Sequence, residues 1–195
     1  LRDAGLRRGT VSIDTLDRET FRMLTRRDDL PRVLAGIEAA RAAGFRETKL
    51  DTVVIAGVND GELPALLDHA RSIGAEIRFI EYMDVGGATR WNMDRVVSRQ
   101  RVLELLARAF GPVRALPRTD SAPAERFELG DGTTFGVIAS VTQPFCATCD
   151  RARLTADGMW FTCLYATEGT DLRGLLRSGA DDTAIRARLH EAFPL

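Results

Sequence analysis

The three cysteines of this chain all lie in one short stretch, residues 144–165, and this stretch restricts the fold and the chemistry more than any other feature. Cys146 and Cys149 form a Cys-x-x-Cys turn, and Cys163 follows across an Asp157-Gly158 pair. Asp-Gly pairs favour two-residue hairpin loops because both positions tolerate positive φ. We therefore expect a hairpin that returns Cys163 toward Cys149 and gathers three sulfurs at one end. The cross-strand pairs that this loop predicts are Thr155 with Trp160, Leu154 with Phe161, and Ala152 with Cys163.

Three gathered thiols are a metal-type array, because sulfurs held by tight turns can share one soft inorganic centre. A structural zinc and an iron–sulfur cube normally take four protein ligands, and neither His69 nor His190 has the spacing of an obvious fourth. With three thiolates one metal position stays open, which suits the binding of a small molecule. A redox Cys-x-x-Cys disulfide is the alternative that the residues leave open.

Three basic side chains are candidates for anion binding. Strand alternation is expected to put Arg151 and Arg153 on one face beside the sulfurs, where they could hold a carboxylate or phosphate through bidentate bonds. A solvated strand face is the alternative for this pair. Lys49 is the only lysine among 27 basic residues, which suggests that a compact ammonium is needed there, with chance as the alternative.

The first part of the chain alternates β-rich runs with helical patterns, which predicts βαβ units and a parallel sheet. Strands are expected at 10–14, 50–55 and 77–82, each followed by a helix, the three helices ending at Gly44, at Gly74 and near Phe110. Further strands are expected at 113–116, 126–129 and 134–141, and helices at 171–177 and 182–193.

Polar residues interrupt the three predicted parallel strands. Strands covered by helices are normally apolar on both faces, yet these strands carry five polar side chains. They are Ser12, Asp14, Lys49, Asp51 and Arg78. Each could be an exposed strand cap, but five from three neighbouring strands suggest a polar lumen.

The composition is that of a soluble globular protein, with 45% apolar residues, a net charge of -1 and no apolar run long enough to span a membrane. No stretch looks like a signal or transit peptide. Positive charges spread along a nearly neutral chain argue against a general nucleic-acid surface. Odd, clustered cysteines suit a reducing cytoplasm better than a secreted disulfide framework.

The run Phe-Cys-x-x-Cys-x-Arg-x-Arg-Leu-Thr-x-Asp-Gly-x-x-x-x-Cys-Leu resembles the carboxy-terminal cluster motif of the MoaA family, the radical S-adenosylmethionine enzymes that begin molybdenum cofactor synthesis. The resemblance extends to residues 11–17, 49–55 and 78–83, so it covers most of the chain. That family opens with a Cys-x-x-x-Cys-x-x-Cys loop for a first cluster and ends with Gly-Gly, and neither is present here. We interpret the sequence as an internal fragment.

The resemblance implies an α/β fold: the second half of a partial (β/α)6 TIM-type barrel over residues 1–112, then a smaller α+β region over 113–195 that carries the cysteine hairpin. It implies a GTP 3',8-cyclase, which converts GTP to (8S)-3',8-cyclo-7,8-dihydroguanosine 5'-triphosphate by a 5'-deoxyadenosyl radical mechanism. The fragment alone is expected to be inactive. The alternatives are another radical S-adenosylmethionine enzyme with an auxiliary cluster, or a non-enzymatic module stabilised by zinc.

The resemblance also implies roles for particular residues, although it assigns none to catalysis. Cys146, Cys149 and Cys163 would ligate an auxiliary [4Fe-4S] cluster. The implied GTP contacts are Lys49, Arg78, Arg151, Ala152 and Arg153, and the implied S-adenosylmethionine contacts are Ser12 and Met83. A second [4Fe-4S] cluster belongs to the full-length protein.

The partners implied by the resemblance are GTP and S-adenosylmethionine, with no nucleic acid polymer and no membrane. The product would pass to the cyclic pyranopterin monophosphate synthase. A homodimer is compatible with this interpretation, and the expected location is the cytoplasm.

Overall fold

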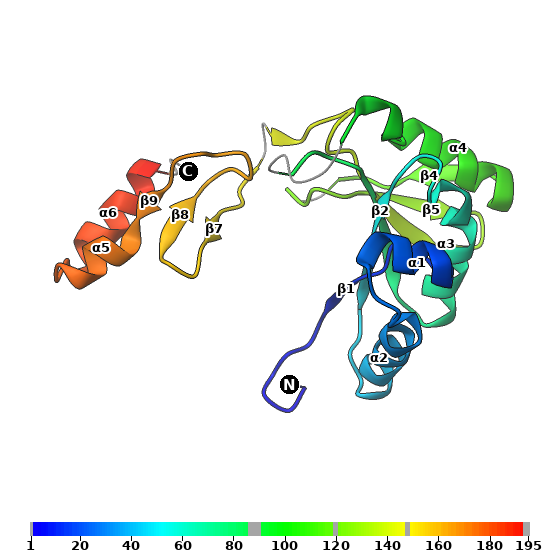
Figure 1. Ribbon diagram of the computed structural model, residues 1–195, viewed down its shortest axis with the longest axis horizontal. Coiled ribbons are helices and arrows are strands. Elements are labelled where there is room, and N and C mark those ends of the chain that lie inside the picture. Colours follow the sequence, from blue (N-terminus) through cyan, green and yellow to red (C-terminus); the bar gives the residue numbers. More distant parts are fainter. Residues whose placement is uncertain (1, 86–90, 119–120, 147–148, 193–195) are drawn as a thin grey trace. The chain divides into compact units, whose positions relative to one another are not determined.

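The computed structural model describes residues 2–85, 91–118, 121–146 and 149–192 (Figure 1). The chain divides into two compact units, the first made of residues 1–83 and 91–147 and the second of residues 84–90 and 148–195. The functional division that the sequence predicts at residue 112 stays a prediction. No helix in the described ranges combines the length and the apolar character needed to cross a membrane.

The first unit is built on a six-stranded mixed sheet with the strand order β1-β2-β3-β6-β5-β4. Its four parallel strands are β1 (Thr10–Ser12), β2 (Lys49–Val54), β3 (Glu76–Glu81) and β6 (Thr134–Ile138). The antiparallel strands β5 (Glu125–Leu129) and β4 (Val113–Ala115) complete the sheet. The predicted α/β class is thereby confirmed, whereas a partial barrel stays a prediction.

Four helices cover the apolar side of this sheet: α1 (Arg18–Thr25), α2 (Leu30–Ala42), α3 (Leu63–Ser72) and α4 (Arg99–Phe110) (Figure 1). Short 3₁₀ turns at Asp60–Glu62 and Met93–Arg95 precede α3 and α4. Strand alternation sends Leu50 and Val54 of β2 and Phe79 of β3 into the core, where each is fully buried. Leu66 and Leu67 of α3 join the same core, as the helical spacing predicts.

The second unit consists of a small antiparallel sheet and two helices. Its strands are β7 (Arg153–Leu154), β8 (Met159–Phe161) and β9 (Thr170–Asp171), in the order β7-β8-β9. They are followed by α5 (Leu172–Arg177) and α6 (Asp182–Ala192). Asp171 caps α5 by accepting a hydrogen bond from the Gly174 N–H, at 2.8 Å.

The hairpin between β7 and β8 corrects the predicted register. Leu154 pairs with Trp160 and Arg153 with Phe161, one position away from the expected pairs. The Thr155 N–H donates to the Met159 carbonyl at 2.9 Å, which closes a loop of three residues, Ala156 to Gly158, and not of two. Gly158 has φ +84°, as the last position of a three-residue loop requires.

This correction changes where two predicted residues stand. β7 is only two residues long, so Arg151 precedes the strand and does not share a strand face with Arg153. The physical reason is local: the Thr155 hydroxyl bonds the Met159 N–H at 3.0 Å and also contacts Asp157, which favours the longer loop.

Candidate functional site

A row of polar residues crosses the side of the main sheet opposite to the helices. Asp51 stands in register between Ser12 of β1 and Arg78 of β3, and Arg78 is followed by Gly136 of β6. Lys49 lies one pleat earlier and pairs with Glu76. We call this side, carrying Ser12, Lys49, Asp51, Glu76, Arg78 and Arg126, the polar face. It brings together three of the predicted site residues: Ser12, Lys49 and Arg78.

Some charged groups of the polar face are hydrogen-bonded to one another, and others are not. Glu76 accepts two hydrogen bonds from Arg126, at 3.0 and 2.8 Å, whereas its distance to Arg78 Nε is 3.9 Å. Arg78 Nε and Asp51 Oδ1 are both buried without a hydrogen-bond partner among the described residues. Burial raises the pKa of Asp51 above its ordinary value, although the charges of Arg78 and Lys49 oppose this rise.

A hollow of about 600 Å³ lies at the amino ends of β2, β3 and β6. Its lining includes Lys49, Arg71, Glu76, Arg78 and Arg126. Arg71 is bonded to Asp68 and Asp131, each at 2.6 Å, and Arg126 is bonded to Glu76. Lys49 and Arg78 are therefore the cations of this hollow best placed to meet an anion. Its volume is in the range of small-molecule sites, which is roughly 300–1,000 Å³.

A buried carboxylate at the carboxyl end of β3 organises the loops around it. Glu81 is 1% exposed and accepts hydrogen bonds from the backbone N–H groups of Arg99, Val141 and Thr142, at 2.8, 2.8 and 2.7 Å. The Thr142 hydroxyl adds a fourth bond at 2.5 Å. We call this arrangement the Glu81 clamp. It joins the start of α4 to the segment that leads to Cys146.

The sequence analysis missed the Glu81 clamp, and one signal could have revealed it. Glu81 continues the alternation of Ile77 and Phe79, which places a carboxylate on the buried side of β3. A buried carboxylate must find hydrogen-bond donors, so such a position predicts a nearby helix start or loop. Met83, a predicted S-adenosylmethionine contact, lies two residues beyond Glu81 and is half-buried.

Polar side chains also hold the carboxyl ends of β1 and β2 together. The Asn59 amide donates to the carbonyls of Asp14 and Val53, at 2.7 and 2.9 Å. Glu62 accepts from the Thr15 hydroxyl at 2.6 Å and from the Leu16 N–H at 2.9 Å. These bonds fix the loops at the strand ends where ligands of parallel α/β sheets usually bind.

Two of the three cysteines, Cys149 and Cys163, accept a hydrogen bond at sulfur. The Arg151 guanidinium donates to Cys149 Sγ at 3.4 Å, and the Tyr165 N–H donates to Cys163 Sγ at 3.4 Å. The backbone N–H of Arg151, followed by its guanidinium, lowers the pKa of the Cys149 thiol. Such thiolates are suitable ligands for a soft metal or an iron–sulfur cluster.

The three predicted ligands are divided between the compact units. Cys146 is exposed in the first unit, while Cys149 and Cys163 belong to the second. Residues 147 and 148 fall outside the described ranges. Within those ranges no three His, Cys, Asp or Glu side chains lie close enough to hold a metal ion. The three-cysteine cluster therefore stays a prediction, as do the nucleotide contacts of half-buried Ala152 and exposed Arg153.

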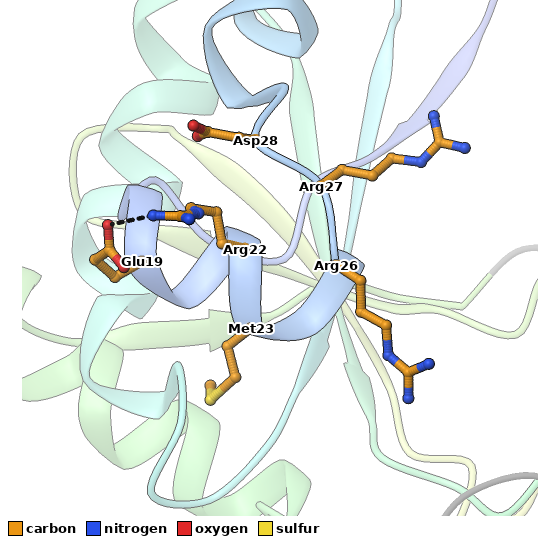
Figure 2. A pocket seen from close by; sticks show the side chains of 6 residues that line it. All are labelled: Glu19, Arg22, Met23, Arg26, Arg27 and Asp28. Atoms are coloured by element: carbon orange, nitrogen blue, oxygen red, sulfur yellow. Dashed lines mark hydrogen bonds and ion pairs between the residues drawn. The ribbon is translucent and has the colours of Figure 1, made fainter.

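A second hollow, of about 500 Å³, lies over α1 and is a poor candidate for a site. Figure 2 shows Arg22 bonded to Glu19, with Arg26 and Arg27 pointing apart into solvent. Asp28 is held by Arg18 at 2.6 Å. Binding sites have convergent polar groups, and these groups are either paired or divergent.

Comparison with protein families gives two matches along the chain. Residues 75–194 match the family described as Molybdenum Cofactor Synthesis C, and residues 1–70 match the Radical SAM superfamily. The chain belongs to the Molybdenum Cofactor Synthesis C family, which agrees with the MoaA family predicted from the cysteine motif.

Curated relatives agree with this family. GTP 3',8-cyclase 3 of Mycobacterium bovis is 57% identical over 180 residues, which are 92% of this chain and 48% of that protein. GTP 3',8-cyclase 1 of Mycobacterium tuberculosis is 54% identical over 92% of this chain and 50% of its own length. The GTP 3',8-cyclase of Acidothermus cellulolyticus is 50% identical over 99% of this chain and 54% of its own length. The chain spans about half the length of the curated relatives it matches.

Proposed function

We propose that this chain is the carboxy-terminal part of a GTP 3',8-cyclase of molybdenum cofactor synthesis. The observation that carries the proposal is the 57% identity to GTP 3',8-cyclase 3 over 92% of the chain. The reaction is the conversion of GTP to (8S)-3',8-cyclo-7,8-dihydroguanosine 5'-triphosphate. S-adenosylmethionine, with a first [4Fe-4S] cluster in the full-length protein, supplies the 5'-deoxyadenosyl radical for this reaction.

The proposed ligands of an auxiliary [4Fe-4S] cluster are Cys146, Cys149 and Cys163. The Arg151 guanidinium, 3.4 Å from Cys149 Sγ, supports this role, because it stabilises the thiolate form of Cys149 that such a cluster requires. Three thiolates leave one iron without a protein ligand. The bound cluster would thus have one iron available to the guanine base of GTP.

The triphosphate of GTP is the proposed ligand of Lys49 and Arg78. Both lie on strands, so their positions are fixed more firmly than loop positions would be, and both line the same hollow. Charge-assisted hydrogen bonds are the strongest that a phosphate can receive. Arg151, Ala152 and Arg153 are further proposed contacts of GTP, and Ser12 and Met83 are the proposed contacts of S-adenosylmethionine.

The remaining proposals concern the setting of the enzyme. We place it in the cytoplasm, where clustered free cysteines stay reduced. The product passes to the cyclic pyranopterin monophosphate synthase. The arrangement is compatible with a homodimer.

Anaerobic reconstitution with iron and sulfide tests the cluster. The chain should become brown and hold about four irons, and replacement of Cys146, Cys149 or Cys163 by Ala should lower iron and sulfide content.

Calorimetry tests the proposed GTP contacts. Lys49→Ala and Arg153→Ala should keep iron while weakening GTP binding by roughly tenfold to a hundredfold. Lys49→Arg should restore only part of that loss, because its planar fork cannot replace a compact ammonium.

Two results would contradict the proposal. A colourless protein with stoichiometric zinc would favour a structural module. Unchanged iron in all three cysteine variants would show that the cysteines do not form a cluster site.

A further inference from the structure

Arg126, on β5, lines the same hollow as the proposed triphosphate contacts Lys49 and Arg78. It stands in register with Gly136 of β6, which in turn stands in register with Arg78 of β3. Residues directly opposite one another on neighbouring strands face the same side of a sheet, so the two arginines flank a glycine on the polar face. A Cβ atom at position 136 would lie only 3.2 Å from Arg78 Cγ. The stem of Arg78 therefore passes close to the strand between it and Arg126.

The Glu76 carboxylate is shared by the two arginines. Its Oε2 accepts hydrogen bonds from Arg126 Nε and Nη2, at 3.0 and 2.8 Å, and its Oε1 lies 3.9 Å from Arg78 Nε. The Glu76 side chain is 17% exposed, whereas that of Arg126 is 53% exposed. A largely buried carboxylate on β3 thus holds a solvent-accessible guanidinium in the lining of the hollow. These bonds leave Nη1 of Arg126, for which the described residues supply no partner.

Arg71, another cation of the lining, is arranged differently. Its two terminal nitrogens are occupied by Asp68 and Asp131, each at 2.6 Å, and neither aspartate lines the hollow. A triphosphate carries more negative charge than Lys49 and Arg78 together can neutralise. Arg126 is the remaining cation of the described lining that keeps a terminal nitrogen for a ligand.

We propose that Arg126 is a further contact of the GTP triphosphate and that Glu76 is the residue that positions it. Arg126 Nη1 donates to a phosphate oxygen while Nε and Nη2 stay on Glu76. The guanidinium is then oriented before the ligand arrives, which strengthens binding because less side-chain freedom is lost. This inference rests on the proposed function and adds two residues that recognise the phosphate chain.

Calorimetry on the cluster-reconstituted protein tests Arg126 with two ligands, GTP and inorganic tripolyphosphate. Arg126→Gln removes the charge of an exposed side chain, so the fold should be kept. It should weaken the binding of both ligands by roughly tenfold to a hundredfold, since a hydrogen bond to a charged group is lost. Unchanged affinity for both ligands would overturn the proposal.

Arg114→Gln is the matched control. Arg114 pairs in register with Glu128, two residues beyond Arg126 on β5, so it lies on the same face of the sheet. It is also ion-paired with that glutamate, but neither residue lines the hollow. This variant should leave both affinities within about twofold of the parent.

Glu76→Ala distinguishes a positioning residue from a simple negative charge. Loss of positioning should weaken GTP binding, whereas loss of a repelling charge alone would tighten it. Unchanged or tighter binding would therefore overturn the role of Glu76. Glu76→Gln keeps an acceptor oxygen for Arg126 and should restore part of the affinity. In the double variant with Arg126→Gln the two losses should be less than additive, because Glu76 acts through Arg126, and full additivity would also contradict this role.

Tripolyphosphate separates this inference from the proposed function. A protein that binds tripolyphosphate through Arg126 but binds no guanine nucleotide would overturn the proposed function and support the phosphate contact. A protein that binds GTP equally well with and without the Arg126 guanidinium would overturn the inference alone.

Discussion

Asp51, on β2, and Asp14, two residues beyond the end of β1, are two half-buried carboxyl groups that differ in their hydrogen bonding. Burial raises the pKa of both. Asp14 is satisfied by the Val53 N–H, while one oxygen of Asp51 has no partner in the described chain. A carboxylate kept in a position that does not favour its charge indicates a requirement other than stability. The ionised Asp51 carboxylate is therefore expected to lower the stability of the folded chain, and this effect can be measured.

The cost of Asp51 should appear in the pH dependence of stability. A carboxyl whose pKa is higher in the folded than in the unfolded chain binds more protons when folded, so its ionisation destabilises the fold as the pH rises above about 4. Asp51→Asn should unfold at a higher temperature than the parent near neutral pH, and the difference should vanish on acidification. Circular dichroism melts between about pH 4 and pH 8 measure this. A less stable Asn variant at neutral pH would mean that Arg78 and Lys49 outweigh burial.

Two local devices hold the segments on either side of the described cysteines. In the first unit the Glu81 clamp binds residues 141 and 142 before Cys146. In the second unit the β7–β8 loop is docked on α5, because the Gly158 carbonyl accepts from the Leu172 N–H at 3.0 Å. Each device rests on a single residue that can be altered.

Glu81→Gln should release the clamp. One carboxylate oxygen becomes an amide nitrogen facing N–H donors, which should lower the free energy of unfolding by about 3 kcal/mol. Hydrogen exchange should accelerate at the Val141 and Thr142 amides. The matched control is Glu62→Gln, which should instead accelerate exchange at Leu16, whose N–H donates to Glu62 at 2.9 Å. Unchanged protection of Val141 in the Glu81 variant would show that the clamp does not hold this segment.

Gly158→Ala should loosen the docking of the loop on α5. An added Cβ would lie 2.5 Å from Arg173 Cβ, and the φ of +84° is itself unfavourable for alanine. Gly132→Ala separates the two effects, since Gly132 has φ +85° but no atom within 4 Å of the added Cβ. Both variants should lose about 1 kcal/mol through backbone strain. Only Gly158→Ala should also accelerate hydrogen exchange at the Leu172 amide.

At the scale of the whole molecule, the prediction concerns which clusters these 195 residues can hold. All three cysteines are assigned to one auxiliary cluster, and the 195 residues hold no others. The proposed chemistry needs a first cluster to reduce S-adenosylmethionine. These residues can therefore be tested for binding of iron and GTP separately from the radical reaction, which needs the first cluster.

A preparation of these 195 residues alone should neither form 5'-deoxyadenosine nor consume GTP under reducing anaerobic conditions, even when it holds iron. Chromatography of the reaction mixture measures both compounds. The positive control is a longer protein that joins a Cys-x-x-x-Cys-x-x-Cys loop to this chain. Formation of 5'-deoxyadenosine by the 195 residues would show that a first cluster is dispensable.

Much of the first unit follows from periodicity along the chain. The predicted strands at 50–55 and 77–82 agree with β2 and β3 to within one residue, and the predicted apolar face of α3 is buried. Patterns of this kind report how a segment meets the core, which is a local property. The polar residues of the site were found in the same way, because they interrupt that pattern.

The pairing of distant segments was decided by tertiary structure. β6 lies beside β3 although β4 and β5 come between them in the chain, and this puts Gly136 next to Arg78. The hairpin register depends on one hydroxyl of Thr155, which the Asp-Gly signal does not include. The Glu81 clamp joins residues 60 positions apart. Sequence periodicity shows which side chains must be buried or exposed, but not which distant partner will satisfy them, because that choice depends on contacts formed only when the chain is folded.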